Sequence, residues 1–73
     1  MTDVKLSDLN TNDRFFIKKT EDKKELLFMF IVIKKEKIFT KCKPIQNGYV
    51  MNSLDSFSFI NTLLVEPIED TFF

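Results

Sequence analysis

The chain has 73 residues, no net charge, no histidine, one cysteine and one glycine. These numbers exclude several kinds of site. Zinc centres and Ser–His or Cys–His catalysis lack their ligands or base, and a single glycine cannot build a glycine-rich phosphate loop. We therefore expect one small domain that is not an enzyme and that uses no metal and no cofactor.

The charges are segregated along the chain although they cancel overall. Residues 1–13 carry net −2, residues 14–43 net +6 and residues 44–73 net −4. A basic middle and an acidic end can steer partners, or pair with each other between subunits. The single cysteine and the lack of an apolar stretch in the opening MTDVKLSDLN favour a reducing, cytoplasmic setting.

The N-terminal part predicts a lead-in to a sheet. Leu6 and Leu9 are spaced so that both can lie on one side of a single helical turn. Residues 10–13, NTND, form a turn cluster. Residues 14–19, RFFIKK, then predict a first strand, and residues 20–25 are expected to form a charged loop.

The chain is organised around residues 26–33, LLFMFIVI, which predict a strand rather than a helix. Most of these residues are aromatic or β-branched, the length is typical of a strand, and both flanks are charged. On a strand, alternate residues point to opposite faces: Leu26, Phe28, Phe30 and Val32 to one, Leu27, Met29, Ile31 and Ile33 to the other. One face lines a core, and the other needs a terminal segment or a second subunit to cover it.

A second hydrophobic pattern follows a polar turn predicted at residues 34–37. Residues 38–45 alternate between apolar and basic side chains, which predicts a strand with one buried and one wet face. Cys42 is expected to be a small core residue on the buried face rather than a reactive thiol. Pro44 lacks an N–H and is expected at an edge or a bulge.

Asn47 and Gly48 give the strongest local signal in the sequence. Asn-Gly suits both central positions of a type I′ turn, which joins two antiparallel strands. This turn places Gln46 opposite Tyr49 and Ile45 opposite Val50. Residues 49–52 therefore predict a short strand.

In the C-terminal third, the sequence leaves two possible structures for one segment. Residues 53–62 fit either an extended segment, because Phe57 and Phe59 alternate with serines, or a short helix. Residues 63–66, LLVE, predict a last strand that Pro67 ends.

The opening KLSDLNTNDRFFI resembles the "L-x-D-L-x-x-G-D-x-F" opening of small SH3-like barrel proteins common in phages and low-GC bacteria. The later order is similar too, from the apolar strand and the strand with alternating cysteine to the closing Val65-Glu66-Pro67-Ile68. Asn12 stands where the family has glycine, although asparagine also tolerates left-handed backbone. The resemblance implies an all-β fold, a barrel of about five antiparallel strands with a short N-terminal turn. It implies no single function.

The preferred hypothesis is a small binding module that acts by protein–protein contact. The second apolar face of residues 26–33 favours a homo-oligomer, or a protein that binds and inhibits a host protein. The lysine- and phenylalanine-rich composition without alanine is typical of a small gene of a phage or a low-GC bacterium. The candidate self-association residues are Leu27, Met29, Ile31, Phe72 and Phe73.

Nucleic-acid binding is the alternative, because aromatic side chains interleaved with lysines often hold single strands. The zero net charge argues against it. The candidate binding residues are Lys18, Lys34, Lys35, Phe39, Lys41, Lys43 and Tyr49. A third hypothesis is a pocket between subunits that sequesters a small anion or nucleotide on lysines. No membrane partner is expected, since spanning a bilayer takes about 20 apolar residues.

Overall fold

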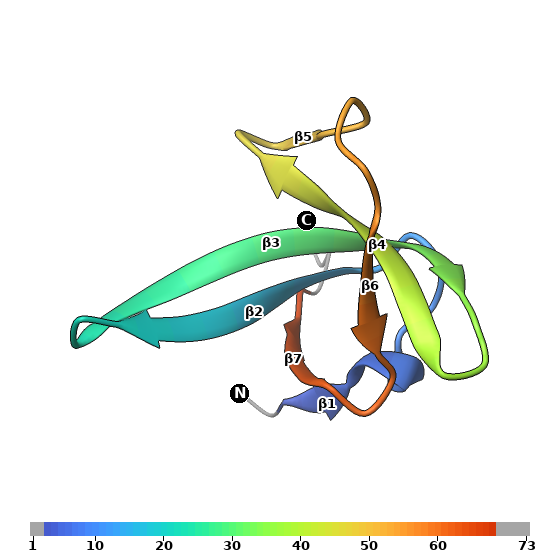
Figure 1. Ribbon diagram of the computed structural model, residues 1–73, viewed down its shortest axis with the longest axis horizontal. Helices are drawn as coiled ribbons and strands as arrows, with labels where there is room; N and C mark the ends of the chain where they lie inside the picture. The colour runs from blue at the N-terminus through green and yellow to red at the C-terminus, as the bar shows by residue number, and fades with distance from the viewer. Residues whose placement is uncertain (1–2, 69–73) are drawn as a thin grey trace, which may run out of the picture.

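The computed structural model describes residues 3–68 and confirms an all-β fold. Seven strands form one antiparallel sheet in the spatial order β1-β7-β2-β3-β4-β5, with β6 also pairing with β4 (Figure 1). The strands are β1 (Val4–Lys5), β2 (Arg14–Glu21), β3 (Lys24–Lys35), β4 (Phe39–Gln46), β5 (Tyr49–Val50), β6 (Phe57–Ile60) and β7 (Leu64–Pro67). Among the described residues β1, at one end of this order, pairs with neither β5 nor β6 at the other end, so the sheet is not a closed barrel. In this part of the chain no helix is long and apolar enough to cross a membrane.

The predicted N-terminal turn is present as a 3-10 helix, η1 (Leu6–Asp8). The backbone N–H of Leu6 donates to the carbonyl of Leu63 at 2.8 Å, which ties η1 to the segment between β6 and β7. Leu6 and Leu9 are both buried, as their spacing predicts. Asn12 then adopts a φ of 76°, the left-handed conformation that asparagine tolerates.

The strand predicted at residues 26–33 is confirmed and lies within β3. The charged loop predicted at residues 20–25 is wrong. β2 and β3 stay paired up to Glu21 and Lys24, and only Asp22 and Lys23 form the turn, with φ values of 51° and 63°. Positive φ at both positions is typical of a type I′ turn. Neither residue is glycine, so the sequence carried no turn signal there.

The Asn47-Gly48 turn is confirmed, with φ values of 53° and 83°. Ile45 lies opposite Val50, as predicted. Phe57–Ile60 is strand β6, so the helical alternative for residues 53–62 is wrong.

The polar turn predicted at residues 34–37 begins later than expected, because β3 continues to Lys35. A register shift between Val32 and Lys34 makes Ile33 an extra residue against β4. Pro44 lies inside β4, opposite Phe30 of β3, and between the stretches of β4 that pair with β5 and with β6. It is not at the bulge, but among the described residues it has a strand on its β3 side only, which is the edge position that its missing N–H predicts.

Residues directly opposite each other in an antiparallel sheet share one face. Phe15 lies opposite Pro67 on one side and Phe30 on the other, and this row defines the inner face. The Phe30 ring contacts the rings of Phe15, Phe57 and Phe59, with centroids 5.9, 5.7 and 5.1 Å away. The buried core consists of Leu6, Leu9, Phe15, Phe30, Val32, Cys42 and Val65.

Cys42 is fully buried on the inner face, which confirms its predicted place in the core. Burial raises the pKa of its thiol to about 12. The thiolate is the reactive form of cysteine. We therefore expect Cys42 of the folded protein to react with a thiol reagent such as DTNB only when the structure opens and exposes it. The unfolded thiol ionises above about pH 8.5, so this group's contribution to stability should fall as the pH rises from there toward 12.

The measurement is the rise in absorbance as DTNB reacts with the thiol, followed in native buffer and in denaturant. Slow reaction in native buffer and immediate reaction in denaturant is the expected result. Immediate stoichiometric reaction in native buffer would place the thiol at the surface.

Candidate functional site

A row of apolar side chains crosses the face of the sheet opposite the core. Phe16 lies opposite Met29, Met29 opposite Ile45, and Ile45 opposite Val50. All four side chains are half-buried. We call Phe16, Met29, Ile45 and Val50 the outer row, and the side of the sheet that carries them the outer face. With strands about 4.8 Å apart, the row is about 14 Å long.

Two further apolar residues of β3 flank the outer row. Leu27 and Ile31 lie two positions from Met29 on either side, so alternation puts them on the same face. Leu27 is 51% exposed, and Ile31 is half-buried. Three of the predicted self-association residues, Leu27, Met29 and Ile31, are therefore brought together. Phe72 and Phe73 lie outside the described residues.

Basic side chains surround this apolar surface. Arg14 lies opposite Ile31 on β2, and Lys43 lies opposite Ile31 on β4. Lys18 lies opposite Leu27. The rim of the outer face is therefore positive beside its apolar centre.

Lys18 is held by an acidic residue of the neighbouring strand. Its Nζ lies 2.9 Å from Oε1 of Glu66, and Glu66 itself lies opposite Phe16. The hydrogen bond to Glu66 and the negative charge of that carboxylate raise the pKa of Lys18. Glu66 thus belongs to the sheet and neutralises one end of the rim.

Two other predicted binding lysines also have partners within the chain. Lys43 Nζ donates to the carbonyls of Asn52 and Leu54 at 3.2 and 2.7 Å, which fixes the segment after β5. Lys41 Nζ lies 3.5 Å from Oε2 of Glu36. These lysines support the local structure, which reduces the charge that they offer to a ligand.

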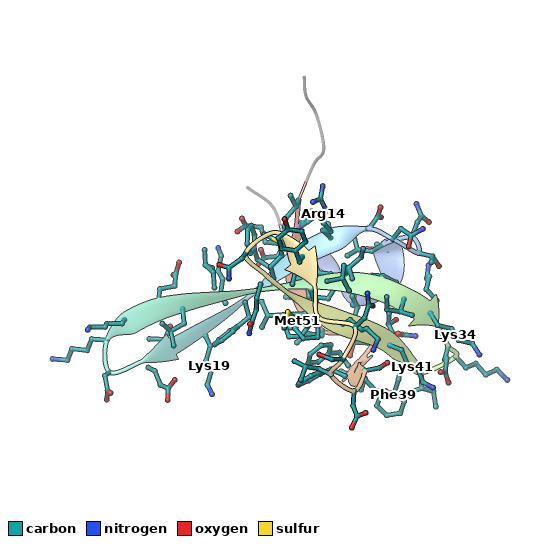
Figure 2. The ribbon with its side chains drawn as sticks, turned by 90° about the horizontal axis from the view of Figure 1, so that it is seen from above. Arg14, Lys19, Lys34, Phe39, Lys41 and Met51 are labelled. Carbon is teal, nitrogen blue, oxygen red and sulfur yellow. The ribbon has the colours of Figure 1, made fainter. Side chains whose placement is uncertain are left out.

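The predicted nucleic-acid residues fall on both sides of the sheet. Lys34 lies opposite Lys41 on the outer face, and Phe39 lies two positions from Lys41. Figure 2 shows Lys34, Phe39 and Lys41 gathered at one end of the molecule, with Lys19 at the other. Lys35 lies opposite Thr40, and Tyr49 lies opposite Gln46, so alternation assigns both to the inner side. The structure separates these two residues from Phe39, Lys41 and Lys43.

The sequence does not predict Phe16, Ile45 and Val50 as site residues. The Asn47-Gly48 turn already placed Ile45 opposite Val50, but nothing in the sequence set the register of β2 against β3. Without that register the outer row could not be assembled. Within residues 3–68 no group of three or more His, Cys, Asp or Glu side chains is arranged to hold a metal ion.

Comparisons of this chain with protein-family models, with curated proteins and with solved structures found no match.

Proposed function

We propose that this chain is a small non-enzymatic binding module that acts by protein–protein contact through its outer face. The observation that supports this most is the outer row, an apolar strip on the side of the sheet that the core does not use. Apolar side chains grouped on the surface of a small protein often mark an interaction site. The exposed Leu27 extends this strip along β3.

The charges around the outer row indicate the chemistry of the partner. Protein interfaces commonly have an apolar centre and a polar rim. Here the rim carries Arg14 and Lys43 beside Ile31, while Lys18 at the other end is paired with Glu66. A partner that fits this surface offers apolar side chains surrounded by carboxylates, and the basic rim would raise its rate of association.

We further propose that the sheet is a variant of the small SH3-like barrel. The short turn η1 before the first long strand, the left-handed Asn12 and the order of the later segments support this relation. Within the described residues, its departures from a five-stranded barrel are the seven paired strands and the absence of a pair between β1 and either β5 or β6. The buried, unpaired Cys42 fits a reducing cytoplasm.

Nucleic-acid binding is the weaker proposal for the same face. Lys18, Lys41 and Lys43 have acceptors within the chain, and Tyr49 lies on the other side of the sheet. Binding of this kind would be lost steeply with added salt, whereas contact through the outer row would be much less sensitive.

The test is photo-crosslinking in the cells that make the protein. A photo-reactive residue at Leu27, on the outer face, should give protein adducts. The same residue at Thr62, exposed on the turn before β7, should give none. Adding Met29→Lys should abolish the Leu27 adducts, because it puts a charge in the centre of the outer row. Absence of adducts at Leu27, or adducts that nuclease removes, would overturn the proposal.

A further inference from the structure

The β2–β3 hairpin extends beyond the rest of the sheet as a two-stranded ribbon, which Figure 1 shows projecting from the body. β7 pairs with β2 only at Phe15 and Phe16, and β4 pairs with β3 only from Met29 onwards. Among the described residues, positions 17–21 of β2 therefore have a strand on one side only. We call this side the open β2 edge. Such an edge is a ready template for pairing with another strand.

Alternate peptide groups of β2 face this edge. The carbonyl of Arg14 accepts from the N–H of Ile68 at 3.0 Å on this side of the strand. Because peptide groups alternate between the two sides of a strand, those of Lys18 and Thr20 point the same way. In the part of the chain that the structure describes, these two residues have no strand beside them on this side.

Along the open β2 edge, basic residues come before Thr20 and an acidic residue follows it. Two antiparallel copies of this edge would therefore place opposite charges across from each other. Residues 18–22 are Lys-Lys-Thr-Glu-Asp. If two copies lie antiparallel with Thr20 opposite Thr20, each Lys19 faces Glu21 of the other copy. Opposite charges directly across an antiparallel pair are stabilising, and like charges are destabilising.

Other registers lack this complementarity. Sliding one copy by two residues in one direction brings Lys19 against Lys19. Sliding it by two residues in the other direction brings Glu21 against Glu21. A slip of one residue brings the peptide groups of one copy that face the edge opposite peptide groups of the other copy that face β3, so the hydrogen-bond ladder cannot form. The charges therefore favour one register of self-pairing.

We propose that two copies of this chain pair through their open β2 edges, around a two-fold axis beside Thr20. The partner at this edge is a second copy of the chain, because two antiparallel copies of the edge place lysine opposite glutamate. The axis is perpendicular to the sheet, so the joined sheet β3-β2-β2-β3 has both outer faces on the same side. This deepens the proposed function and rests on it, since the dimer would present two outer rows to one partner.

The test uses two charge reversals at exposed positions of β2, Lys19→Glu and Glu21→Lys. Each reversal alone turns two attractive pairs across the axis into repulsive ones, so each variant should dimerise at least about tenfold more weakly than the parent chain. An equimolar mixture should form a heterodimer, because the two glutamates of the first variant then face the two lysines of the second. Lys37→Glu makes the same charge change outside the ribbon and should leave dimerisation intact.

Sedimentation velocity at low salt, over a range of concentrations, gives the readout. Dimerisation of the parent chain that weakens with added salt, loss in each single variant and recovery in the mixture would support the proposal. A parent chain that stays monomeric, or single variants that dimerise as well as the parent, would overturn it. Leu27 lies on β3 and not on the open β2 edge itself. Adducts at Leu27 to proteins other than a second copy that persist without dimers would leave the proposed function standing while removing this inference.

Discussion

Replacing Phe30 with alanine is expected to lower the free energy of unfolding by about 3–5 kcal/mol. Phe30 is 8% exposed, and its ring contacts Phe15, Phe57 and Phe59. The ring therefore joins β2, β3 and β6, and its removal leaves a cavity at the centre of the core. In a domain of this size that loss is a large fraction of the total stability.

The matched control is Ile31→Ala, one position further along the same strand. Ile31 points to the outer face and is half-buried, so its loss should cost only about 1 kcal/mol. Urea unfolding of both variants, followed by circular dichroism, measures the difference. Equal costs at the two positions would mean that the two faces of β3 are not divided into core and surface.

The second large effect is expected from Asn61→Ala, which should cost about 2–3 kcal/mol. The Asn61 side chain accepts from the Thr40 hydroxyl at 2.6 Å and donates to the carbonyls of Glu36 and Lys37 at 3.0 and 3.1 Å. It therefore fastens the turn between β3 and β4 to the end of β6. Thr40 is fully buried, so the alanine variant leaves its hydroxyl without a partner away from water.

A double-mutant cycle with Thr40→Val isolates this contact. Valine removes the hydroxyl at nearly constant volume, so Asn61→Ala should cost less in the Thr40→Val background by about 1 kcal/mol. The measurement is again urea unfolding, applied to the parent chain, both single variants and the double variant. Strictly additive costs would show that the hydrogen bond contributes nothing to stability.

The parts of the fold that follow from short-range patterns could be predicted from the sequence. The alternation around Cys42 and the Asn47-Gly48 turn were sufficient to place β4 and β5 and their register. Leu6 and Leu9 were sufficient for the buried turn η1. In each case the residue types themselves restrict the backbone or the face that must be buried.

The parts that depend on long-range register could not be predicted. The Asp22-Lys23 turn has no glycine, so the sequence did not show that β2 and β3 form one long hairpin. The exposure of Leu26 and Phe28, which share the inner face with Phe30, follows from where β4 ends and not from β3 itself. Tyr49 is different, because the predicted Gln46–Tyr49 pair already implied that it lies on the side opposite Lys41.

The central claim is that this sheet has apolar side chains on both faces, and that the chain buries a core on the inner face but covers the outer row only in part. The most direct measurement is the attenuation of methyl NMR signals by a soluble paramagnetic probe, at concentrations where the protein is monomeric. We predict strong attenuation at Leu27, Ile45 and Val50, and protection at Leu6, Val32 and Val65. Equal protection of both sets would contradict the claim, because it would mean that the outer row is already covered in the isolated chain.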